Sequence, residues 1–82
     1  MVNWNKFDAA DYDLEFNEEK LSAHGVSVEE AAELLWNEMI VRKNKGFKDR
    51  VQILGRADSG RSIKLIVHIQ GKTLRVITGW PL

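Results

Sequence analysis

Two histidines, His24 and His68, are side chains of this chain that could transfer a proton near neutral pH. Arg50 and Arg75 flank His68 when three expected strands are paired as argued below. Two guanidiniums can hold a phosphate whose negative charge grows in a transition state. An imidazole between them can accept a proton from a ribose hydroxyl. His68, Arg75 and Arg50 are therefore the candidate catalytic residues of a metal-free ribonuclease.

Further residues could hold RNA beside this row. Lys64 and Arg56 extend the positive surface toward one end of the same strands, and Trp80 could stack on a base or contact a partner. His24 is a secondary candidate, because it falls at the end of an expected helix, where an imidazolium also interacts well with the last carbonyls. An ordinary solvated sheet face with aligned basic residues is the competing explanation for the whole set.

The composition removes several classes of chemistry. The chain has no cysteine, which excludes disulfides, thiolate metal sites and cysteine nucleophiles. Its two histidines are far apart in sequence and show no metal-ligand spacing, and its glycines lack the spacing of a phosphate-binding loop. We therefore expect neither a metal nor a cofactor.

The length of 82 residues predicts one domain, residues 1–82, with a single small core. A domain of this size buries only about 60% of its unfolded surface, so stabilisation by a protein partner or by a second copy in a homodimer is expected. No apolar run approaches the roughly 20 residues of a membrane span, and the N-terminus is polar and acidic. The prediction is a cytoplasmic protein without membrane contact.

Charge is divided sharply along the chain. Residues 1–38 hold ten acidic and two basic residues, a net charge of −8, whereas residues 39–82 hold ten basic and two acidic residues, a net charge of +8. Such asymmetry is typical of a C-terminal half that meets an anionic partner such as RNA. Mutual attraction of the two halves within the fold explains it equally well.

The N-terminal half has the pattern of two helices. One is expected from Asp8 to Leu21, with Asp8, Asp13 or Asn17 as its N-cap and Gly25 as the left-handed residue after its end. The second is expected from Val28 to Asn37, because Ser27 and Glu30 have the spacing of a capping box. Its buried stripe is predicted at Val28, Ala31, Ala32, Leu35 and Met39, and Trp36 is predicted to join the core.

After Met39 the apolar period changes from 3.6 to 2. Strands are expected near Asp49–Ala57, Ser62–Gln70 and Thr73–Gly79, with a weaker one near Ile40–Asn44. A two-residue loop at Gly71-Lys72 places His68 opposite Arg75 and Ile66 opposite Ile77. A three-residue loop closed by Gly60 places Val51 opposite Val67.

Both registers place the same apolar residues on one face, which the helices must cover. These residues are Val51, Ile53, Ile63, Leu65, Val67, Ile69, Leu74 and Val76. The predicted fold is thus α+β, with two N-terminal helices packed on a three- to four-stranded antiparallel sheet.

Several short segments resemble the BrnT family of toxins. The first is His24-Gly25-Val26-Ser27-Val28-Glu29-Glu30-Ala31, and the others are Arg50-Val51-Gln52-Ile53-Leu54-Gly55, Gly60-Arg61 and Leu74-Arg75-Val76-Ile77. The resemblance spans about residues 15 to 78. It implies a RelE-like fold and a metal-free, translation-arresting ribonuclease held in check by an antitoxin. It matches Arg50 and Arg75 to basic strand positions of the family and His24 to its helix-end histidine.

The chain also departs from this family at two points. Ala23 stands where the family commonly has a lysine, and Thr78-Gly79-Trp80-Pro81-Leu82 stands where it usually has Ser-Ala-Arg and a further helix. The expected function is therefore a toxin-like endoribonuclease, and the alternative is a non-catalytic relative that binds RNA or a protein through its basic sheet face.

Overall fold

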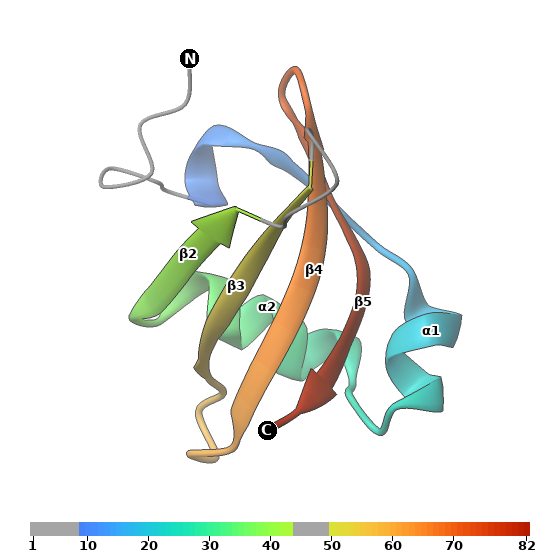
Figure 1. The fold of residues 1–82 in the computed structure, drawn as a ribbon, viewed down its shortest axis with the longest axis vertical. Helices are drawn as coiled ribbons and strands as arrows, with labels where there is room; N and C mark the ends of the chain where they lie inside the picture. The colour runs from blue at the N-terminus through green and yellow to red at the C-terminus, as the bar shows by residue number, and fades with distance from the viewer. Residues whose placement is uncertain (1–8, 44–49) are drawn as a thin grey trace.

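The computed structural model describes residues 9–43 and 50–82 and shows an α+β domain. It contains a mixed sheet of five strands: β1 (Asp13–Phe16), β2 (Met39–Lys43), β3 (Arg50–Arg56), β4 (Ser62–Gln70) and β5 (Thr73–Pro81). Two α-helices, α1 (Glu18–Ala23) and α2 (Val28–Trp36), and a 3₁₀ turn, η2 (Ala9–Asp11), complete the described fold (Figure 1).

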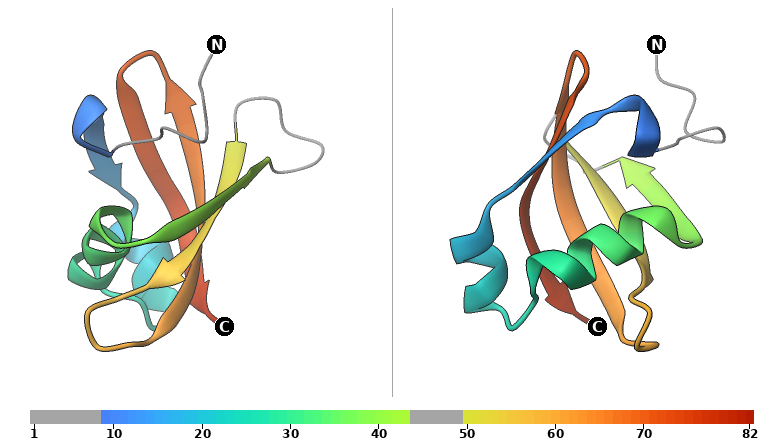
Figure 2. Two further views of the ribbon diagram at one scale, coloured as in Figure 1. Left: turned by 90° about the vertical axis from the view of Figure 1, so that its left-hand side faces the viewer. Right: turned by 180° about the vertical axis from the view of Figure 1, so that it is seen from behind.

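The sheet has the order β1-β5-β4-β3-β2. The pairs formed by β2 to β5 are antiparallel, whereas β1 runs parallel to β5. Helix α2 lies behind the strands in Figure 1 and in front of them in the right-hand view of Figure 2, where it crosses β3 and β4. Helix α1 packs beside β5. Both helices thus cover one face, called the inner face below, and the opposite face is called the outer face.

The helical region is fixed by its local capping residues. The Asn17 side chain accepts a hydrogen bond from the backbone N–H of Lys20 and caps α1, and Gly25 follows this helix with a φ of 76°. Ser27 and Glu30 form the predicted capping box at the start of α2. Asn17 as N-cap, Gly25 as turn residue and the capping box are confirmed.

The expected long helix from Asp8 to Leu21 is wrong. Within the described residues, Asp13–Phe16 forms strand β1 instead, and only Glu18–Ala23 is helical. The strand gains backbone hydrogen bonds from β5 and packs Leu14 and Phe16 against the core. Long-range pairing therefore overrides the weak local helix preference of this acidic segment. The sheet has five strands, not three or four, and is mixed rather than wholly antiparallel.

The expected registers of the two hairpins are largely confirmed. Val51 pairs with Val67, His68 pairs with Arg75, and the predicted inner-face residues of β3, β4 and β5 belong to the core or pack on it. Gly60, with a φ of 89°, and Gly71, with a φ of 59°, make the two turns. Asp8, Asn44 and Asp49, where three expected elements begin or end, lie outside the described residues.

One pair of the expected register is wrong because β5 contains a bulge. Val67 pairs with Val76, but Ile66 pairs with Thr78, so Ile77 is the extra residue on β5. The shift by one residue reverses the faces of the residues that follow. Gly79 therefore lies opposite Leu65 on the inner face, and Trp80 lies opposite Lys64 on the outer face.

The buried stripe of α2 also differs from the expected one. Leu34 and Leu35 are buried together with Ala31, whereas Trp36 is 59% exposed at the end of the helix. Trp36 lies next to the apolar stripe of α2, but it is the last residue of the helix, and the chain then turns toward β2. The core prediction for Trp36 is therefore wrong.

Candidate functional site

The candidate site lies on the outer face. Alternation along each strand directs the basic residues Arg42, Arg50, Arg56, Lys64 and Arg75 to this face, together with His68 and Trp80. Its described acidic residues, Asp13 and Glu15, come from β1 at one edge. The outer face is therefore a mainly basic surface with an acidic edge.

The three predicted catalytic residues form one row across adjacent strands. Arg50 pairs with His68, and His68 pairs with Arg75. Directly paired residues have Cβ atoms about 4.5–5.5 Å apart, so one phosphate group can reach all three side chains. His68 and Arg50 are half-buried, whereas Arg75 is exposed. The structure therefore brings these three residues together in the predicted order.

Glu15 extends the row by one residue, which sequence reasoning missed. Arg75 donates from Nε at 3.0 Å and from one terminal nitrogen at 2.9 Å, and both bonds go to Oε1 of Glu15. The two side chains remain 60% and 49% exposed. An ion pair this exposed contributes at most about 1 kcal/mol, so a phosphate can compete with Glu15 for the guanidinium.

A sequence signal for Glu15 existed. Asp13, Leu14, Glu15 and Phe16 alternate polar and apolar residues, as a half-buried strand does. This alternation covers only four residues. The surrounding segment has no β-branched residue between Val2 and Val26, and this absence favours a helix over a strand.

Trp80, Lys64 and His24 form a second cluster near the other end of the sheet. The Lys64 ammonium lies 5.6 Å from the centre of the Trp80 ring, within the range of a cation–π interaction. The His24 ring lies 5.9 Å from the Trp80 ring and is tilted by 58°. His24 caps α1, where its backbone N–H donates to the carbonyl of Leu21 at 3.0 Å. This cluster unites two predicted RNA-binding residues with the secondary candidate.

The two clusters are separated along β4. Lys64 and His68 are four residues apart on this strand, which corresponds to about 13 Å at 3.3 Å per residue. His24, which lies beside Trp80, therefore does not join the row of His68.

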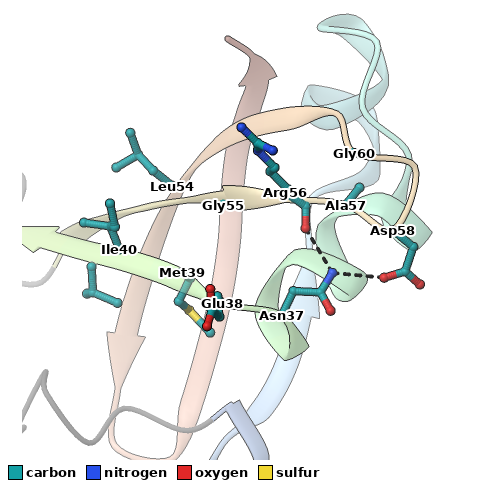
Figure 3. A pocket seen from close by; sticks show the side chains of 11 residues that line it. Asn37, Glu38, Met39, Ile40, Leu54, Gly55, Arg56, Ala57, Asp58 and Gly60 are labelled. Atoms are coloured by element: carbon teal, nitrogen blue, oxygen red, sulfur yellow. Dashed lines mark hydrogen bonds between the residues drawn. The ribbon is translucent and has the colours of Figure 1, made fainter.

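Arg56 lies at the end of β3, outside both clusters. Its side chain is exposed, and its carbonyl accepts a hydrogen bond from Nδ2 of Asn37 at 3.0 Å. Asn37 also donates to Asp58 at 2.9 Å. These groups border an open hollow in which Ile40, Leu54 and Arg56 lie on the same side of β2 and β3 (Figure 3). Arg56 is thus a peripheral member of the basic surface.

Within residues 9–43 and 50–82, ion pairs join the acidic and basic halves of the chain. Besides Glu15 and Arg75, Arg61 contacts Glu30 at 3.1 Å and donates to the carbonyl of Gly25 at 2.9 Å. The backbone N–H of Ser27 and the Arg61 guanidinium hold the pKa of Glu30 below its usual value, although partial burial opposes them. Mutual attraction of the halves therefore accounts for part of the charge division.

In residues 9–43 and 50–82, no three side chains of histidine, aspartate or glutamate are arranged to hold a metal ion. Neither helix of this part of the chain has the length and apolar character needed to cross a bilayer.

No family model matches the chain, and no curated protein and no solved structure matches it either.

Proposed function

We propose that the outer face binds single-stranded RNA and that the chain is a toxin-like endoribonuclease of RelE-like fold. The observation that carries the proposal is the position of His68 between Arg50 and Arg75 on three adjacent strands. A proton-transfer group and a phosphate clamp are the two parts that RNA cleavage without a metal requires. The BrnT-like segments around His24, Arg50 and Arg75 support the same proposal.

Each residue of the row has a defined role in this reaction. Arg50 and Arg75 bind the oxygens of one phosphodiester, and His68 takes the proton from the neighbouring ribose 2′-hydroxyl. The 2′ oxygen then attacks phosphorus, the bond from phosphorus to the 5′ oxygen breaks, and the leaving oxygen takes a proton from solvent. The products are a 2′,3′-cyclic phosphate and a 5′-hydroxyl end.

The Glu15 contact shapes how Arg75 enters this reaction. Because Glu15 holds Nε and one terminal nitrogen of Arg75, a phosphate that binds this edge of the guanidinium must displace the carboxylate. The contact is exposed, so this displacement costs little. As a toxin of this kind, the protein would act in the cytoplasm and be neutralised by an antitoxin protein.

The same contact favours a second candidate function. An arginine already neutralised by a carboxylate is less suited to stabilising a transition state. In that case the outer face binds RNA or an acidic protein segment without cutting it.

Cleavage of a labelled RNA by the purified protein separates the two functions. We expect His68→Ala to lose cleavage and to keep binding, while His24→Ala, which removes the other imidazole, keeps cleavage. The cyclic phosphate product should be visible by mass spectrometry. Expression in a bacterial host, with growth and RNA integrity followed together, is the companion experiment. Intact RNA and normal growth at high protein levels would contradict the enzyme and favour the binding module.

A further inference from the structure

Trp80 owes its place on the outer face to the bulge at Ile77. Without this extra residue the pairing of Val67 with Val76 would continue, and Trp80 would fall opposite Ile63 on the inner face. The observed register places Trp80 opposite Lys64 and turns Gly79 inward. The bulge therefore moves a large aromatic ring from the core side to the face that carries the row of His68.

The inner position left to Gly79 accepts no side chain. A Cβ atom there would lie 2.5 Å from Cδ2 of Leu65, 2.9 Å from the Lys64 carbonyl oxygen and 3.2 Å from Cδ2 of Leu21. Only glycine fits at position 79 on the inner face. Trp80, the next residue of β5, therefore faces outward. The glycine at position 79 and the register of β5 thus both place Trp80 on the outer face.

We propose that Trp80 is a stacking platform for one nucleobase of a single-stranded RNA. The ring is half-buried, which holds it in place. The His24 ring lies 5.9 Å from it, and the Lys64 ammonium lies over it at 5.6 Å. A base that stacks on the face under Lys64 displaces this ammonium toward the adjoining phosphate. Lys64 adds a positive charge for the phosphate that accompanies the base. Aromatic rings interleaved with basic residues are how proteins bind single strands with little sequence preference.

The distance to His68 suits this arrangement. Lys64 and His68 project from the same face of β4 about 13 Å apart, so a short stretch of extended RNA can place a base on Trp80 and a phosphate in the row. The inference rests on the proposed RNA binding and adds a base subsite to it. The site recognises the base by its π-face, so it accepts all four bases.

Removing the Trp80 ring from the protein and removing the bases from the RNA should weaken binding to a similar extent. We expect Trp80→Leu to weaken binding of a short fluorescein-labelled single-stranded RNA by roughly 5- to 150-fold, the usual effect of losing one base stack. The wild-type protein should bind the same RNA with its bases removed about as weakly, and Trp80→Leu should cause no further loss with that backbone. Trp80→Phe, which keeps an aromatic face, should retain most of the affinity.

The control is Trp36→Leu, which removes an exposed tryptophan from α2 on the other side of the sheet and should leave RNA binding unchanged. Circular dichroism and thermal unfolding verify that each variant folds. If Trp80→Leu does not fold, the comparison of normal and base-free RNA on the wild-type protein carries the test.

Three outcomes would overturn the subsite. Equal affinity of Trp80→Leu and wild type for normal RNA, with binding still dependent on salt and on Arg50, removes the base subsite and leaves the proposed function standing. Equal weakening of both RNAs by Trp80→Leu makes Trp80 a structural residue. Absence of RNA binding by the wild type at low salt overturns the subsite and the proposed function together.

Discussion

At the scale of single residues, Glu15 is the side chain whose role is easiest to test. We expect Glu15→Gln to strengthen RNA binding by up to about fivefold, because Arg75 no longer has to leave a carboxylate. Stability should change little, since the pair is exposed. Fluorescence anisotropy with labelled RNA measures the effect.

The matched control for Glu15 is Glu29→Gln. Glu29 is exposed on α2, across the core from the outer face, where its charge is screened beyond about 8–10 Å. This variant should bind RNA like the wild type. Unchanged or weaker binding by Glu15→Gln would contradict competition between Glu15 and the phosphate for Arg75.

Glu30 predicts a pH dependence of stability. Its pKa is lowered in the folded protein, so its contribution is complete above the unfolded value of about 4.3 and is lost as the pH falls through the folded pKa. We expect Glu30→Gln to reduce the free energy of unfolding at neutral pH and the deficit to shrink below about pH 4. Urea denaturation across this range measures it. A deficit that grew on acidification would contradict the assignment.

At the scale of elements, the end of β5 depends on Gly79. Gly79→Ala should lower the free energy of unfolding by about 1–3 kcal/mol, because the added methyl meets the Leu65 side chain and the Lys64 carbonyl oxygen. Gly55→Ala is the matched comparison with less close contacts. Its Cβ would lie 3.1 Å from the Glu38 carbonyl oxygen and from Cγ of Leu34. We expect a smaller loss at Gly55 by chemical denaturation. An unchanged free energy of unfolding for Gly79→Ala would contradict the close contact of Gly79 with Leu65 and the Lys64 carbonyl oxygen.

At the scale of the whole molecule, the basic character of the outer face predicts that salt weakens the proposed RNA binding. Each phosphate contact with single-stranded RNA contributes a slope of about −0.7 to the logarithm of affinity against the logarithm of salt. Three or four contacts from the outer face therefore predict a slope of roughly −2 to −3. The contacts proposed here are those of Arg50, Arg56, Lys64 and Arg75.

Single substitutions test this count. Arg75→Ala should weaken binding and remove somewhat less than one unit of slope. Lys20→Ala, a base on the exposed side of α1, should leave the slope unchanged. An RNA affinity that changes neither with salt nor in Arg75→Ala would favour an acidic protein surface as the partner of the outer face.

Much of the fold followed from the sequence because its signals are local. The capping box at Ser27 and Glu30 depends on residues three apart, and the two hairpin registers depend on loop length and on the alternation of apolar residues. Those registers were enough to place His68 between Arg50 and Arg75. The sequence by itself therefore determined the α+β class, the core face of β3, β4 and β5, and the row of candidate catalytic residues.

Only the tertiary structure decided the neighbours of that row. Strand β1 forms because β5 offers it a parallel edge, and this distant pairing brings Glu15 to Arg75. The bulge at Ile77 reverses the faces of the last strand and, with α1 beside β5, places Trp80 next to His24. Such contacts join residues 56 to 60 positions apart, and no local spacing encodes them, because they depend on how separate elements pack together.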